Sequence, residues 1–277
     1  MGDRTFMADY WLPALVTLLV WWASTGLIIY LDGLRRETFR WTMLGATSLL
    51  LVALTGLHSV AWDTSATGAW LAFACGLVAW AWIEIAFLTG LVTGPRREAI
   101  PRSTRGWPRF RAAVAAILWH ELAIIAMAAV IVALSWRAPN QIGTWTFVAF
   151  WVMRQSAKLN VFLGVRNLSE SFLPDHLKYL ESFFTRRPMN LLFPVSVLAG
   201  VVGVVLLALA AVDPIATRHE TIGFTLLATL VGLGLIEHVF MVLPMSADGL
   251  WKWSLAARRA PAPAAPQEGR ASPSSLT

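Results

Sequence analysis

The chain has 277 residues, of which 57% are hydrophobic and only 14% are charged. A soluble domain carries about 25% charged residues, so this composition excludes an ordinary soluble protein and favours a chain surrounded mostly by lipid. The net charge of +6 lies mainly in particular connections, where membrane topology explains it without a nucleic-acid partner. The single cysteine, Cys75, excludes an intramolecular disulfide.

Seven apolar runs predict an all-α, polytopic transmembrane helix bundle. Each run is about 20 residues long, which is the length that a helix needs to cross a bilayer. They cover residues 10–31, 40–60, 67–92, 111–135, 143–164, 190–212 and 221–243. We therefore predict a seven-helix transmembrane domain over residues 1–255. The following residues, 256–277, are rich in Pro, Ala and Ser and are predicted to form a disordered cytoplasmic tail.

The basic residues predict the orientation of the bundle. Seventeen of the 22 Lys and Arg residues fall in alternate connections that share one side, and three fall on the other side. The remaining two, Arg154 and Lys158, lie within the fifth run. Because cytoplasmic connections carry the excess of Lys and Arg, we expect the N-terminus outside and the C-terminus in the cytoplasm.

The cytoplasmic connection over residues 165–189 has a pattern of its own. Apolar residues at helical spacing alternate there with charged ones, which predicts an amphipathic helix over residues 174–185 on the cytoplasmic surface. Such a segment is a candidate docking element. A simple connector before the sixth run is the alternative.

Ionisable and amide side chains interrupt four of the apolar runs. They are Glu84, His120, Glu121, Arg154, Lys158, Asn160, Glu237 and His238. Each ionisable group costs about 2.5–3.5 kcal/mol near the bilayer centre, so it needs an explanation. At 1.5 Å per helical residue, the groups lie at one level, about 9–15 Å from the cytoplasmic ends of their runs. If they point inward, they form one buried polar site.

Three interpretations of this polar layer stay open at the level of sequence. In the first, the carboxylates offset Arg154 and Lys158 and set helix register. In the second, the layer binds a ligand, and His120, His238 or Glu84 holds a metal ion or the magnesium of a chlorin. In the third, it performs proton transfer or redox chemistry.

The metal interpretation has a weakness in the spacing of the ligands. Di-iron carboxylate bundles use Glu-x-x-His, which puts both ligands on one helix face. Here each histidine of the layer is instead adjacent to a glutamate, in His120–Glu121 and Glu237–His238. Adjacent helical residues point about 100° apart, so each pair is a poor chelate.

Several runs of the sequence resemble one family. They include WWASTGLIIYLDGL (21–34), FLTGLVTGPRR (87–97), HELAI (120–124), SAKLNVFLGVRNLSESFLPDHLKYLESFF (156–184) and RPMNLLFPVS (187–196). These runs are similar to the PuhE-type photosynthetic complex assembly proteins of purple and other anoxygenic phototrophic bacteria. The resemblance covers residues from about 10 to about 255.

The resemblance implies a role in photosynthesis. Such proteins are encoded beside the reaction-centre H subunit and are associated with assembly of the reaction centre and core antenna, and with bacteriochlorophyll supply. It implies a multi-pass protein of the bacterial inner, photosynthetic intracytoplasmic membrane. The expected partners are reaction-centre or core-antenna subunits and pigment-synthesis proteins, besides the lipid bilayer, and the expected ligand is bacteriochlorophyll or a late precursor.

No catalytic residue set comes with the resemblance, which favours an assembly factor over an enzyme. The alternative is a metal-dependent membrane oxidoreductase or hydroxylase that acts on a pigment or quinone through the same polar layer.

Overall fold

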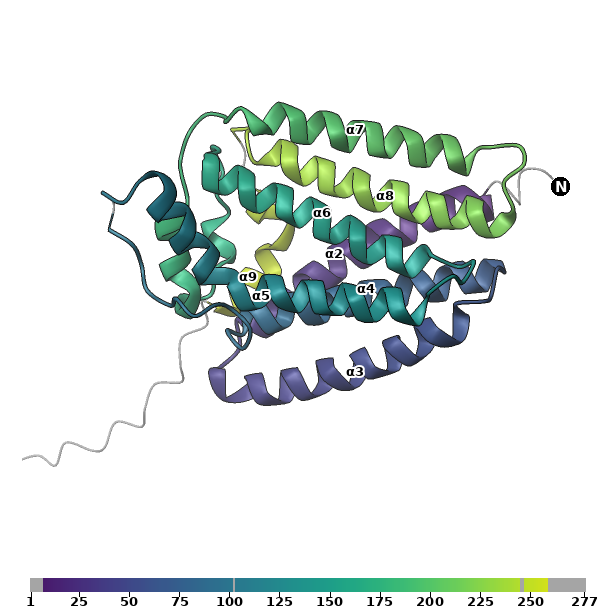
Figure 1. Cartoon of the computed structure of the whole chain (residues 1–277), viewed down its shortest axis with the longest axis horizontal. Helices are drawn as coiled ribbons and strands as arrows, with labels where there is room; N and C mark the ends of the chain where they lie inside the picture. Colours follow the sequence, from purple (N-terminus) through teal and green to yellow (C-terminus); the bar gives the residue numbers. More distant parts are fainter. Residues whose placement is uncertain (1–6, 102, 245–246, 259–277) are drawn as a thin grey trace, which may run out of the picture.

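Long helices in one bundle make up the protein in a computed structural model, which describes residues 7–101, 103–244 and 247–258 (Figure 1). In chain order the long helices are α2 (Leu12–Asp32), α3 (Phe39–Val60), α4 (Ala66–Leu88), α5 (Gly106–Leu134), α6 (Ile142–Leu163), α7 (Leu192–Ala211) and α8 (Arg218–Phe240). A π-helical turn, η1 (Met7–Trp11), leads into α2. Short helical elements lie between or after the long helices: η2 (Arg36–Thr38), η3 (Glu170–Phe172), η4 (Asp175–Phe183), η5 (Ala247–Trp251) and α9 (Lys252–Arg258).

Six of the long helices have the length and hydropathy needed to cross a membrane. These spans are Ala8–Asp32, Arg36–Val60, Ala66–Leu88, Gly106–Leu134, Leu192–Ala211 and Arg218–Phe240. The remaining long helix, α6, has 22 residues, but its charged and amide side chains lower its hydropathy. The prediction of an all-helical membrane protein is therefore confirmed, with six candidate spans.

The helix ends follow from local side-chain chemistry. α8 begins with a capping box in which the Thr217 side chain accepts from the Glu220 backbone N–H and the Glu220 carboxylate accepts from the Thr217 backbone N–H. α4 ends at Leu88, four residues before the predicted end of the third run, because Gly90 adopts a φ of 78°. This left-handed conformation is open to glycine and stops the helix.

The core lies between α4, α6 and α8. It includes Phe73, Trp80 and Ile83 from α4, Phe147 from α6 and Leu226 from α8. In contrast, α7 exposes a row of apolar side chains, such as those of Val195, Leu198, Leu206 and Leu209, on the outside of the bundle. An exposed apolar face of this kind is what a helix in contact with lipid presents.

The segment η4 is helical, as predicted, but it is a 3-10 helix and its apolar side is not free. Leu177, Leu180 and Phe183 are buried against Phe87 of α4 and Ala116 of α5. Apolar residues three positions apart share one face of a 3-10 helix, which has three residues per turn. The segment therefore closes one end of the bundle, at the left in Figure 1, which we call the loop-rich end.

The C-terminal segment folds back against α2. The Trp251 indole donates to the Trp22 backbone carbonyl at 3.1 Å, and the Ser254 hydroxyl donates to the Gly26 carbonyl at 2.7 Å. A Cβ atom on Gly26 would lie 2.2 Å from the Trp253 ring, so only glycine permits this approach. Because α9 continues to Arg258, it passes the boundary expected at residue 255. Residues 259–277 of the predicted tail lie outside the described residues.

Candidate functional site

Two cations lie on the core-facing side of α6. Arg154 and Lys158 are four residues apart and therefore share one face of the helix. Phe147 lies seven residues before Arg154 on the same face and is 1% exposed. The sequence thus places both charges toward the interior of the bundle, where each meets a carboxylate from a neighbouring helix.

The first ion pair joins Lys158 to Glu121 of α5. The Lys158 Nζ lies 2.7 Å from Glu121 Oε1, and the Gln155 amide donates to Glu121 Oε2. Both carboxylate oxygens are therefore bonded. The two side chains of the pair are 21% and 19% exposed. We call this the closed pair.

The second ion pair joins Arg154 to Glu84 of α4. The Arg154 Nη2 lies 3.0 Å from Glu84 Oε2. The Glu84 side chain is 10% exposed, but the Arg154 side chain is 42% exposed. Arg154 Nε and Glu84 Oε1 are buried and have no hydrogen-bond partner in the described part of the chain. We call this the open pair, because the guanidinium keeps a donor, Nε, that no group among the described residues accepts.

A third carboxylate, that of Glu237 on α8, lies near the open pair. The Trp21 indole of α2 donates to Glu237 Oε1 at 3.0 Å. The charges of Arg154 and Glu84 both act on Glu237. Three carboxylates from three helices thus surround the two cations of α6, and the charge compensation predicted from the sequence is present for Glu84 and Glu121.

His238 and Asn160 belong to a separate hydrogen-bonded group. The Gly234 carbonyl can only accept, so His238 Nδ1 donates to it, at 2.8 Å, and Nε2 accepts from the Ser156 hydroxyl at 2.9 Å. Asn160 is fully buried, and its amide donates to Ser156 O and to the Ser196 hydroxyl. His238 thus connects α8 to α6, and Asn160 connects α6 to α7. The polar atoms of both side chains are used in these hydrogen bonds.

His120 is enclosed without such partners. It is 1% exposed and its ring lies 4.4 Å from that of Phe87. Neither ring nitrogen has a hydrogen-bond partner among the described residues. Its backbone N–H donates to the Thr93 carbonyl, and a Cβ on the neighbouring Gly94 would lie 2.2 Å from Ala115 O. The connection after α4 is therefore pressed onto α5 beside this imidazole.

The predicted metal ligands do not converge. Within residues 7–101, 103–244 and 247–258, no three His, Cys, Asp or Glu side chains form a group that could hold a metal ion. His238 is bonded to Ser156, while His120 lies against Phe87. The layer predicted at one depth is thus divided into the closed pair, the open pair with Glu237, and two separately held imidazoles.

Sequence reasoning missed several members of the site. Gln155 and Ser156 lie in the polar run RQSAKLN of α6, and that run within an apolar helix was the signal that could have found them. Trp21 and Asn190 had no such signal. Asn190, two residues before α7, donates to Asn160 Oδ1 at 3.0 Å, and only the packing of the helices brings it there.

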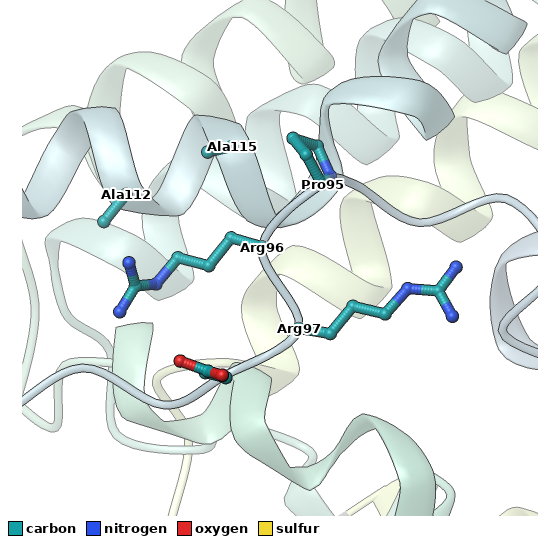
Figure 2. A pocket seen from close by; sticks show the side chains of 6 residues that line it. Pro95, Arg96, Arg97, Ala112 and Ala115 are labelled. Atoms are coloured by element: carbon teal, nitrogen blue, oxygen red, sulfur yellow. The ribbon is translucent and has the colours of Figure 1, made fainter.

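A separate hollow of about 500 Å³ lies at the loop-rich end (Figure 2). It is lined by Pro95, Arg96, Arg97, Glu98, Ala112 and Ala115. Figure 2 shows the Arg96 side chain alongside α5 and the Arg97 side chain pointing away from it. None of the residues that line the hollow belongs to the two ion pairs, so it is distinct from the polar layer.

These features define a multi-pass α-helical membrane protein with charged side chains paired between its helices. The chain belongs to the family described as "Protein of unknown function (DUF3623)", which it matches over residues 7–262. It is 38% identical over 260 residues to the "Uncharacterized 30.4 kDa protein in puhA 5'region" of Rhodobacter capsulatus, covering 92% of this chain and 94% of that protein. No solved structure matches the chain.

Proposed function

We propose that this protein is a PuhE-type assembly factor that helps to build the reaction centre and core antenna. The observation that carries the proposal is the 38% identical relative, whose name places it in the 5' region of puhA. The family resemblance described above associates such proteins with the reaction-centre H subunit. The match extends over almost the whole of both chains, which supports a shared role.

We further propose that the protein crosses the membrane seven times, with its N-terminus outside and its C-terminus in the cytoplasm. The 22-residue length of α6 and its packing against α4 and α8 support a seventh span, as does the segregation of Lys and Arg. The membrane is the bacterial inner, photosynthetic intracytoplasmic membrane. The partners there are reaction-centre or core-antenna subunits and pigment-synthesis proteins.

The orientation is tested by fusing a reporter that is active only in the periplasm, or one that is fluorescent only in the cytoplasm, to the C-terminus. We expect fluorescence and no periplasmic activity. The reverse pattern would contradict the proposed orientation. The same reporter at the N-terminus tests the odd number of spans, because an even number would put both termini on one side.

The polar layer is proposed to contact bacteriochlorophyll or a late precursor. An exposed guanidinium and a carboxylate at membrane depth are costly unless they serve a ligand or a pathway, and Arg154 and Glu237 meet that description. The rival oxidoreductase would act through a metal, and within the described residues no three His, Cys, Asp or Glu side chains form a group that could hold one. We propose pigment handling as the function of the site.

Two measurements test the proposal together. The full-length protein, purified in detergent, is mixed with bacteriochlorophyll and passed over a sizing column, and we expect pigment absorbance to elute with the protein. In a phototrophic host, deletion of the gene is expected to lower the amount of assembled reaction centre and core antenna. A colourless protein together with normal assembly in the deletion strain would refute the proposal.

A further inference from the structure

Arg154 and Glu237 are exposed on helix faces that are otherwise buried. Phe147 and Trp151, seven and three residues before Arg154, lie on the same face of α6 and pack with the core. Leu230 and Leu233, seven and four residues before Glu237, are buried on the same face of α8. Both side chains keep accessible surface beside these buried residues.

Donors without acceptors gather on the same side of α6. Arg154 Nε and Trp151 Nε1 are both buried, and neither has a partner in the described part of the chain. The two residues are one helical turn apart. Buried donors in native proteins are almost always hydrogen-bonded, so two of them beside an exposed guanidinium indicate a place that receives an oxygen acceptor.

Aromatic rings gather beside Glu237 on the side of α2. The Trp21 ring, whose indole is bonded to Glu237, lies 5.4 Å from the Trp251 ring, which lies 5.9 Å from Phe172. Flat apolar surface beside a few convergent polar groups is typical of a site for a small organic ligand.

The two histidines are unsuited to hold such a ligand through a metal. An imidazole–metal bond needs the ring nitrogen about 2 Å from the metal. His238 would have to give up its bonds to Gly234 and Ser156. His120, at 1% exposure and packed on Phe87, cannot reach the centre of a macrocycle unless α4 and α5 separate.

The charges select the kind of acceptor. Glu84 already balances Arg154, and the nearby Glu237 carboxylate accepts from the Trp21 indole. A ligand carboxylate would therefore compete with the Glu84 carboxylate for the same guanidinium and be repelled by it at short range. A neutral carbonyl, as in an ester or ketone, accepts from the guanidinium and the indole without that repulsion.

We propose that the open pair is a ligand site that holds a tetrapyrrole by its peripheral carbonyl oxygens at Arg154, and that the central metal makes no bond to His120 or His238. This inference rests on the proposed function, and deepens it. Its consequence is that recognition does not depend on the metal, so that metal-free and metal-containing forms bind alike.

Three probes test the inference with the full chain in lipid nanodiscs. They are a metal-free chlorin methyl ester, the zinc complex of the same ester, and the metal-free chlorin as its free acid. Binding is followed by quenching of tryptophan fluorescence. We expect the two esters to bind within about twofold of each other and the free acid to bind about tenfold more weakly.

Matched variants separate the open pair from the closed pair. Glu84→Gln/Arg154→Gln neutralises the open pair without leaving an unpaired charge, and we expect it to weaken ester binding about tenfold, since a hydrogen bond to a charged group is lost. Glu121→Gln/Lys158→Gln makes the same change in the closed pair and should bind the esters as the native chain does. His120→Leu and His238→Gln should also bind the zinc ester normally.

The possible results distinguish failure of this inference from failure of the proposed pigment handling. Equal losses in the two double variants would overturn the assignment to Arg154. Zinc-ester binding at least about tenfold tighter than metal-free binding, abolished in His120→Leu or His238→Gln, would overturn the inference and leave the proposed pigment handling intact. If none of the three probes binds, both the inference and the proposed pigment handling fail.

Discussion

The two ion pairs of α6 lie one helical turn apart, yet they differ in how the neighbouring helices enclose them. In the closed pair, Lys158 and Glu121 are both about one-fifth exposed, and the Gln155 amide occupies the second carboxylate oxygen. In the open pair, the Arg154 side chain is 42% exposed, and one oxygen of Glu84 is left without a partner among the described residues.

This difference in enclosure indicates that the same residue types at the same depth can have different roles. A fully bonded pair between α5 and α6 sets how those helices pack, which is the structural role that buried pairs perform in some proteins. A pair with spare donors on an inward yet exposed face has capacity for a ligand. We therefore propose a structural role for the closed pair and ligand binding for the open pair.

The largest expected effect comes from breaking the closed pair. Lys158→Met leaves the Glu121 charge with only the Gln155 amide, and an uncompensated buried charge is costly. We expect a loss of about 3 kcal/mol in the free energy of unfolding, measured by titrating SDS into detergent-solubilised protein. The control Glu121→Gln/Lys158→Gln should lose much less. Equal losses in the two variants would argue that packing, and not charge, holds this region.

The next effect concerns the connection after α4, which lies against α5 beside His120. In Gly94→Ala, the added Cβ would meet Ala115 O at 2.2 Å and the backbone of Ala116, so the 93–96 connection must move away from α5. We expect a loss of about 2 kcal/mol in the free energy of unfolding, with faster hydrogen exchange at the amide of His120. Gly45→Ala, where a Cβ meets nothing within 4 Å, is the matched control. An unchanged hydrogen-exchange rate at the His120 amide would show that the 93–96 connection does not cover this part of α5.

A smaller effect is expected from the open pair. Glu84→Gln/Arg154→Gln removes both charges of the open pair together, so that no uncompensated carboxylate is left, and a partly exposed pair contributes about 1 kcal/mol or less to stability. The same SDS titration should therefore show a clearly smaller loss than Lys158→Met, although ligand binding suffers more. A loss as large as that of Lys158→Met would remove the distinction between the two pairs.

The smallest expected effect concerns Asp63, which lies in the connection between α3 and α4, outside the membrane spans. The Ser65 side chain and backbone hydrogen-bond to the Asp63 carboxylate and lower its pKa. The ionised Asp63 carboxylate therefore stabilises the folded state above the ordinary pKa of aspartate, and this stabilisation is lost as pH falls through the lowered pKa. Thermal unfolding midpoints of the native chain and Asp63→Asn should differ slightly at pH 6 and converge at pH 2. A difference that grows on acidification would contradict this sign.

Much of the architecture could be predicted from the sequence. The apolar runs located the seven long helices of the described residues, six of which have the hydropathy of a membrane span, because a segment in lipid must be apolar and must satisfy its own backbone hydrogen bonds. Helical spacing also indicated that Arg154 and Lys158 share a face and that carboxylates from α4 and α5 lie at the same depth. Some boundaries differed, as at Leu88, where the conformation of Gly90 ended the helix early.

Which carboxylate pairs with which cation was decided only by the tertiary structure, since depth along a helix says nothing about rotation around it. The same holds for the two imidazoles, one bonded to Ser156 and the other packed on Phe87. The return of Trp251 and Ser254 onto α2 likewise depends on contacts between residues more than 200 positions apart. Length and polarity are properties of local sequence, whereas enclosure depends on all the helices that meet at a site.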